Sequence, residues 1–235
     1  MCIRDRYDTT QQYPVIYVLD AEWRFNMVNT LIFDMGANRK IPPHIVVGIP
    51  HIDFKNKRGI DLTFSQSSME YDGTTVDSTV FNATNSGGGA VFFNYFSQEL
   101  IPTINKQYRT NQKNILIGHS YGGYFGSYLL SQDHPFTAFQ IYDPSIWFSD
   151  GEVTKRLQQR GISKEDLNIF IAYQPEPAFH VQKIEAFIQD LSKQKQVKLR
   201  VKKYTNETHN SLFLPSFMEG IRFLYKDYKF IEEAH

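Results

Sequence analysis

The sequence predicts an α/β fold with a mostly parallel central sheet and helices on both faces. Short apolar runs alternate along the chain with segments of helical periodicity, which is the order expected of βα units. Most of the runs are continuously apolar, as strands covered on both faces are. Right-handed crossovers would place the helices on both sides of the sheet. The length of 235 residues favours one domain spanning 1–235.

The strand predictions follow from runs of suitable length and composition. These are 14–19, 44–49, 114–118, 137–142, 168–173 and 197–204. In the last run Val197, Leu199 and Val201 alternate with basic residues, which suits an edge strand with one solvated face. Helical patterns fall between the strands, over 22–36, 88–108, 121–132, 151–160, 177–195 and 211–228.

The segment 52–87 lacks clear periodicity and is rich in Ser, Thr, Asn, Asp and Gly. Loops of this length inside a compact domain are uncommon and often functional. We interpret it as a mobile flap beside the active site, with a disordered surface excursion as the alternative. The glycines at its end are not followed by Gly-Lys-Ser/Thr, so no nucleotide-binding loop is expected.

Composition narrows the class of partner. Lys plus Arg and Asp plus Glu each number 25, and this balance argues against nucleic acid or an anionic membrane as the main partner. The single cysteine, Cys2, excludes an internal disulfide and a Cys-based zinc site, and we expect no metal or cofactor. No apolar run approaches the roughly 18–20 residues of a transmembrane segment.

The N-terminus has an unusual composition. Residues 1–6 contain no apolar signal-peptide region, and an apolar strand begins almost at once, at Pro14. We therefore expect either a fragment or a disordered, non-native segment over 1–8. The compartment stays open: cytoplasmic if the chain is complete, and periplasmic or secreted if its start is truncated.

The stretch 118–122 reads Gly-His-Ser-Tyr-Gly and fits G-x-S-x-G. An apolar run of strand length precedes it and a helical pattern follows, so it is predicted to form a nucleophile elbow. Gly118 and Gly122 would let strand and helix approach closely. Ser120 would then be an exposed nucleophile, and the N–H of Tyr121 would face a developing oxyanion.

A serine nucleophile needs a general base, and His209 is the best candidate. It lies in the polar loop 205–210 after the last strand, at the same end of the sheet as Ser120. The side chain of His119 should point away from the serine, and His180 falls on a predicted helix.

The acid of the triad has two candidates. Glu176 follows the strand 168–173 in a loop with flanking prolines, and it is favoured because such a loop would hold a carboxylate in place. Asp143 ends the preceding strand and is the alternative, unless it only caps a turn or helix. A Ser-His pair without a carboxylate also stays open.

The second oxyanion donor should come from the loop after the strand 14–19. The backbone N–H of Glu22 or of Ala21 is the candidate. A backbone donor tolerates almost any side chain, so the sequence does not choose between them.

Several stretches together carry a resemblance to a known family. They are 13–20 (YPVIYVLD), 58–63 (RGIDLT), 99–105 (ELIPTIN), 117–123 (IGHSYGG), 143–147 (DPSIW) and the His209 loop. On these stretches the chain resembles the esterase D and ferric-enterobactin esterase group of α/β-hydrolases, which is related to the antigen 85 mycolyltransferases. The resemblance implies an α/β-hydrolase fold, with Ser120 as nucleophile, His209 as base and Glu176 at the acid position. It implies oxyanion donors at Tyr121 and just after Asp20.

The sequence departs from that group at two site positions. Ala21 stands where the group often has Gly, and Asp143 stands where it often has Ser. The group also begins earlier, so the resemblance implies a sheet lacking its first one or two strands.

The predicted activity is hydrolysis of a carboxylic ester through an acyl-enzyme. The group implies siderophore, carbohydrate-acyl or simple acyl esters as small-molecule substrates. An acyltransferase with the same triad and a non-catalytic binding protein are the alternatives. Trp147, Arg58 and His119 are the substrate-binding candidates, and the oligomeric state is open.

Overall fold

The computed structural model describes residues 8–230, apart from the side chains of residues 54–56. It contains one six-stranded sheet in the order β2-β1-β3-β4-β5-β6, and every neighbouring pair is parallel. The strands are β1 (Tyr13–Leu19), β2 (Ile45–Ile49), β3 (Thr110–His119), β4 (Phe136–Tyr142), β5 (Leu167–Tyr173) and β6 (Val197–Lys203). The predicted α/β class is confirmed, and β6 lies at an edge as expected.

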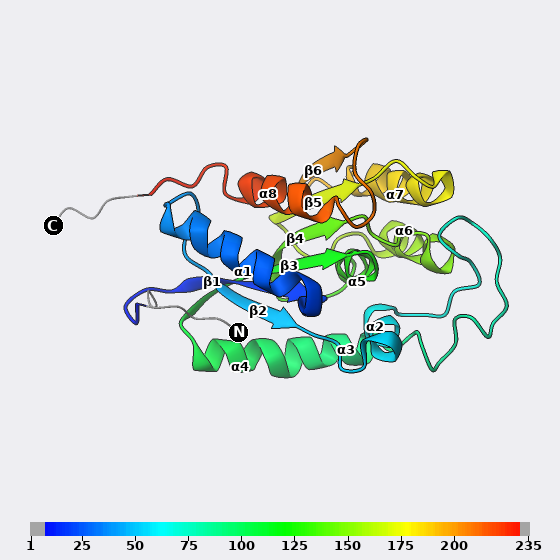
Figure 1. Cartoon of the computed structure of the whole chain (residues 1–235), viewed down its shortest axis with the longest axis horizontal. Coiled ribbons are helices and arrows are strands. Elements are labelled where there is room, and N and C mark those ends of the chain that lie inside the picture. Colours follow the sequence, from blue (N-terminus) through cyan, green and yellow to red (C-terminus); the bar gives the residue numbers. More distant parts are fainter. Residues whose placement is uncertain (1–7, 231–235) are drawn as a thin grey trace.

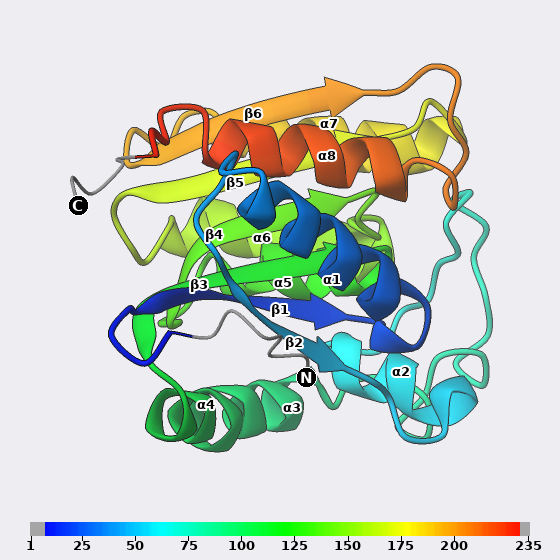
Figure 2. The same cartoon turned by 60° about the vertical axis from the view of Figure 1, so that its left-hand side comes forward.

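Helices cover the two faces unequally (Figures 1 and 2). One face carries α1 (Ala21–Ala37) and α8 (Phe213–Leu224), which lie side by side in Figure 2. The other face carries α2 (Phe54–Leu62), α3 (Gly89–Tyr95), the π-helical turn η1 (Phe96–Leu100), α4 (Ile101–Gln107), α5 (Tyr121–Leu129), α6 (Phe148–Arg160) and α7 (Ala178–Leu191). The predicted helix over 88–108 is therefore three consecutive segments.

The strand β1 shows why its sequence is apolar throughout. All seven of its residues are buried. Ile16 and Val18 pack into the layer with α1 and α8, while Tyr17 and Leu19 pack into the opposite layer. Full burial of an aliphatic side chain of this size contributes about 1.5–3 kcal/mol, so both faces of the sheet hold the fold together.

The sequence prediction missed α2, which lies inside the segment 52–87. Its sequence lacks an apolar stripe, and among its described side chains, those of residues 57–62, Leu62 alone lies in the buried core. The helix is fixed instead from outside, because the N–H of Gly88 donates to the carbonyl of Ile60 over 2.9 Å. Contacts of this kind leave no periodic signal in the sequence.

The rest of that segment, from 63 to 87, runs past the carboxyl ends of the strands, at the right of Figures 1 and 2. Its predicted place beside the candidate site is therefore observed. At the other end of the chain, the non-native segment expected over 1–8 lies outside the described residues except for Asp8, whose N–H donates to Tyr13 Oη over 2.7 Å. Among the described helices, none has the length and apolarity needed to cross a membrane.

Candidate active site

Ser120 lies between β3 and α5 with a backbone conformation that non-glycine residues rarely adopt, φ 59° and ψ −119°. Its N–H donates to the carbonyl of Tyr142 over 3.0 Å, and its carbonyl accepts from the N–H of Ser145 over 3.1 Å. Strain of this kind persists only where the surroundings enforce it. The end of β4 therefore holds the turn at Ser120 from both sides.

Close packing around the turn explains its glycines. A Cβ on Gly118 would lie 2.2 Å from the carbonyl oxygen of Gly122, so no larger residue fits there. A Cβ on Gly123 would meet Pro144 at 3.0 Å, whereas one on Gly122 would make an ordinary contact at 3.4 Å. The prediction holds for Gly118, but Gly123 rather than Gly122 is the second close approach.

His209 follows β6 and reaches the same end of the sheet. Its Nδ1 donates to Asp143 Oδ2 over 2.6 Å. With that nitrogen protonated and held by a carboxylate, the neutral ring has Nε2 as its proton acceptor. The imidazole is 40% exposed, while the Asp143 side chain is fully buried.

Asp143 is held by a second histidine as well. Its Oδ1 accepts from Nε2 of the buried His180 over 3.1 Å and from the N–H of Gln174 over 3.2 Å. Burial raises the pKa of Asp143, but the hydrogen bonds from His180 and His209 outweigh it and lower that pKa to about 2. The carboxylate is therefore ionised at neutral pH.

The preference for Glu176 as the partner of His209 is wrong. Glu176 is exposed, and its backbone N–H donates to Gln174 Oε1 over 3.3 Å within the loop after β5. Asp143, the alternative, comes directly after β4, beside the strand that carries Ser120. A side chain one residue past a strand stays over the sheet edge, whereas Glu176 stands three residues past β5, in solvent.

His119 does not line the cavity that contains Ser120, so its prediction as a substrate-binding residue is wrong. It is buried, and its Nε2 donates to the backbone carbonyl of His209 over 2.6 Å. The two imidazole rings lie 4.4 Å apart. Burial, with the nearby His209, lowers the pKa of His119 to about 3, so the ring is neutral and acts as a support for the His209 loop.

Arg58 does not line the cavity that contains Ser120 either, so its prediction as a substrate contact is not supported. Its Nε and Nη2 donate to the two oxygens of Asp20 over 2.6 and 3.0 Å. It lines a separate hollow of about 240 Å³ on the other side of Tyr121. The guanidinium therefore fixes the turn between β1 and α1.

That turn presents the candidate oxyanion donors. Asp20 has a left-handed conformation, φ 54°, and its carbonyl accepts from the N–H of Trp23 over 3.1 Å. The helices α1 and α5 thus begin at Ala21 and Tyr121, after neighbouring strands. First-turn N–H groups have no partner inside their own helix and carry partial positive charge. The roles of Ala21, Glu22 and Tyr121 as donors stay predictions.

A cavity of about 430 Å³ lies beside Ser120 and His209. Ser120, His209, His180, Ser145, Trp147 and Tyr121 line it. Trp147 thus lies where the sequence placed it. The Oγ atoms of Ser120 and Ser145 are 3.5 Å apart.

Sequence reasoning missed Ser145 and His180. The predicted helix around His180 argues against a role in the site, yet α7 follows β5 and so begins at the site end of the sheet. Its position in the first turn of that helix is the signal that could have found it.

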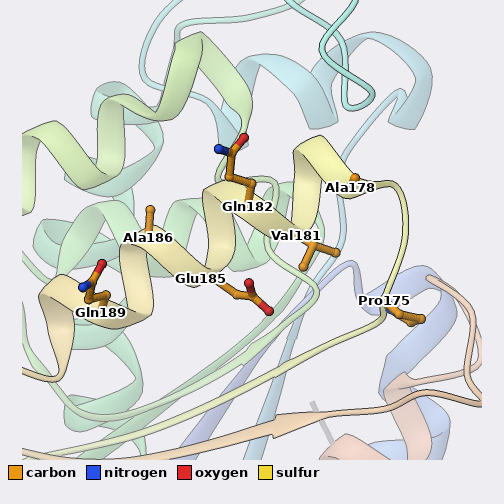
Figure 3. A pocket seen from close by; sticks show the side chains of 7 residues that line it. All are labelled: Pro175, Ala178, Val181, Gln182, Glu185, Ala186 and Gln189. Carbon is orange, nitrogen blue, oxygen red and sulfur yellow. The ribbon is translucent and has the colours of Figure 1, made fainter.

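A larger hollow of about 560 Å³ lies along α7 (Figure 3). Pro175, Ala178, Val181, Gln182, Glu185, Ala186 and Gln189 line it, and they include no Ser, Cys or His. Glu185 accepts hydrogen bonds from Lys203 and from Tyr173 Oη, each over 3.0 Å. Its carboxylate is engaged in structural contacts, so the chemistry belongs to the smaller cavity.

Known proteins indicate the family to which the sequence is similar. The sequence matches the Esterase family, described as "Putative esterase", over residues 3–214. It is 28% identical over 156 residues to the ferri-bacillibactin esterase BesA of Bacillus subtilis (strain 168). The matched region covers 61% of this chain and 52% of that protein. The matched region is thus about half the length of that curated relative.

Solved structures share the fold. An IroE-like serine hydrolase from Shewanella oneidensis superposes with a TM-score of 0.83 at 28% identity, covering 95% of this chain and 73% of the other. The BES protein from Bacillus cereus superposes with a TM-score of 0.78 at 24% identity, covering 91% and 84%. At this lower identity, the similarity to the BES protein shows a shared fold and nothing more.

Proposed function

Because the chain belongs to the Esterase family, we propose that it is a serine hydrolase that cleaves carboxylic esters through Ser120, His209 and Asp143. The observation that carries this proposal is the 2.6 Å hydrogen bond from His209 Nδ1 to the buried Asp143, at the cavity that Ser120 lines. A fixed imidazole beside a strained serine is the arrangement that activates a hydroxyl at neutral pH.

The first half of the reaction forms an acyl-enzyme. Ser120 Oγ attacks the ester carbonyl carbon while His209 Nε2 takes the hydroxyl proton. The carbonyl oxygen becomes an oxyanion, which the N–H of Tyr121 and that of Ala21 or Glu22 stabilise, with each donor worth about 3–4 kcal/mol. The carbon–oxygen bond to the alcohol then breaks, and His209 gives its proton to the leaving oxygen.

The second half returns the enzyme to its starting state. His209 takes a proton from water, the hydroxide attacks the acyl carbon, and Ser120 leaves with the proton from His209. In both halves the imidazole becomes a cation, and the ionised Asp143 stabilises it. In the resting structure Ser120 Oγ contacts Ser145 Oγ over 3.5 Å, a contact long enough for substrate binding to replace at little cost.

The similarity to a ferri-bacillibactin esterase makes siderophore esters the first substrates to test. Simple acyl esters and acylated carbohydrates are the further candidates. An acceptor hydroxyl in place of water would make the protein an acyltransferase, so an alcohol such as glycerol is added to one set of assays.

The test compares wild type with Ser120→Ala. Wild type should hydrolyse p-nitrophenyl butyrate and gain one fluorophosphonate adduct, mapped by mass spectrometry to the peptide with Ser120. The variant should lose the adduct and at least about 10³-fold in kcat, with an unchanged circular dichroism spectrum. An adduct on another residue, or near-wild-type turnover by the variant, would overturn the assignment.

A further inference from the structure

The segment after α2 places one carboxylate at the candidate active site. Glu70 and its neighbour Tyr71 line the same cavity as Ser120 and His209. The Glu70 charge also acts on the site: burial first, and the nearby carboxylate second, raise the pKa of Tyr121 to about 12. Glu70 is half-buried, so its charge is only partly screened by water.

A short hairpin fixes Glu70 in this position. Met69 and Thr75 form an antiparallel bridge, and the N–H of Glu70 donates to the carbonyl of Thr74 over 2.8 Å. The base of the hairpin is tied to α6, because Ser67 Oγ accepts from the N–H of Ser149 over 3.1 Å.

The tip of the hairpin rests on α7. A Cβ on Gly73 would lie 3.0 Å from the ring of Phe179, so the turn packs directly on that side chain. With both its base and its tip anchored, the hairpin presents Glu70 as a fixed feature of the cavity.

The charges around the cavity are predominantly negative. None of the described residues that line it is Lys or Arg. Asp143 behind it is ionised, and its hydrogen bonds hold His180 and His209. The guanidinium of Arg58, beyond Tyr121, pairs with Asp20. Glu70 therefore adds a second negative charge without a cation in the lining to balance it.

Aromatic rings share the cavity with this carboxylate. Trp147 and Tyr71 line it, as does Tyr121, whose ring lies 6.3 Å from that of Trp147. The ring of Tyr121 already faces Arg58 at 5.4 Å. Tyr71 is 54% exposed and so offers an accessible ring, while the largely buried Trp147 contributes the part of its ring that lines the cavity. A carboxylate beside aromatic faces is the combination that binds substituted ammonium groups.

We propose that Glu70, with Trp147 and Tyr71, makes this site selective for esters that carry an ammonium group, and that the same carboxylate disfavours anionic esters. The inference rests on the proposed function of Ser120, and it names the charge class of the substrate.

The test uses three esters of similar length that differ in charge. They are p-nitrophenyl hexanoate, p-nitrophenyl 5-(trimethylammonio)pentanoate and the mono-p-nitrophenyl ester of adipic acid, each corrected for spontaneous hydrolysis. The readout is kcat/KM for each charged ester divided by that for the neutral ester. In Glu70→Gln the cationic ratio should fall about tenfold and the anionic ratio should rise about tenfold.

Two further variants separate the parts of the proposal. Asp72→Asn removes a charge from the same hairpin outside the cavity and keeps the acceptor for the Thr74 N–H, so both ratios should stay as in wild type. Tyr71→Leu should lower the cationic ratio about threefold and leave the anionic ratio unchanged. Raising the salt concentration should weaken the wild-type preference for the cation.

The outcomes distinguish the two proposals. If wild type does not hydrolyse even the neutral ester, the proposed function fails. If it hydrolyses the neutral ester but both ratios are the same in wild type and Glu70→Gln, and neither responds to salt, the substrate inference fails alone. Equal shifts in Glu70→Gln and Asp72→Asn would also overturn it, because they would show a general charge effect.

Discussion

The loops after β4 and β5 start from equivalent places and end in different environments. Both loops follow buried parallel strands at the carboxyl ends of the sheet, and both carry a carboxylate. Asp143, in the first loop, is fully buried and bonded to two histidines. Glu176, in the second, is exposed.

The difference shows that distance from the strand end decides which carboxylate can serve the site. Asp143 is the residue next to β4, and its own N–H donates to the carbonyl of Ala172 on β5 over 2.6 Å. Its backbone therefore continues the sheet, and its side chain is fixed over the edge. Glu176 has left the sheet, so nothing in the core directs its side chain toward His209.

The largest effect should come from Asp143→Asn. Asn tolerates the φ of 40° at this position, so the fold should persist. Its amide would no longer hold His209 in the reactive tautomer, and kcat for an ester should fall about 10³–10⁴-fold. Steady-state kinetics measure the fall, and labelling of Ser120 by a fluorophosphonate should slow in parallel. A loss below tenfold would remove Asp143 from the triad.

A smaller loss is expected when the second histidine is changed. His180→Leu removes the donor to Asp143 Oδ1, and a hydrogen bond to a charged group contributes about 1.5–3 kcal/mol, so kcat should fall about 10–100-fold. His180→Gln can place an amide N–H near the position of Nε2 and should restore most of the rate. Equal rates for the two variants, both stably folded by thermal denaturation, would show that the hydrogen bond is irrelevant.

Asp143 should also contribute to stability in a defined pH range. Its pKa is lowered from 3.8 to about 2, so the folded state favours the ionised form. That contribution is present above about pH 4 and is lost as the pH falls toward 2. The shift corresponds to about 2 kcal/mol in the free energy of unfolding.

Denaturant unfolding of wild type and Asp143→Asn at pH 6 and at pH 2.5 measures this contribution. The stability gap between the two proteins should shrink at the lower pH. A gap that is constant over this range would mean that the carboxylate is not ionised preferentially in the folded state.

The smallest effect should come from Glu176→Gln. The Glu176 side chain is exposed, so kcat and KM for a neutral ester should change less than about twofold. The comparison with Asp143→Asn, made in the same assay, is the sharpest contrast between the two loops. A large loss at Glu176 would reverse the assignment of the acid.

Local sequence determined the fold class and the turn at Ser120. Continuous apolar runs of strand length, set between helical patterns, predict strands buried on both faces. Gly118 is required because the carbonyl oxygen of Gly122, four residues away, leaves no room for a Cβ. These features depend on neighbours close in the chain, so the pattern of residues expresses them directly. The α2 helix has no such pattern in its sequence. It is supported instead by a backbone hydrogen bond from Gly88, outside the helix.

Only the tertiary structure decided which polar side chains meet. Asp143, His180 and His209 come from three different connections, and Glu70 comes from a fourth. Their sequence spacing carries no periodicity, because strand order and crossovers bring them together. The sequence by itself therefore determined the sheet and the strained serine. The packing of loops at the carboxyl ends of the strands decided that Asp143, and not Glu176, contacts His209. The same packing decided which charges surround the serine.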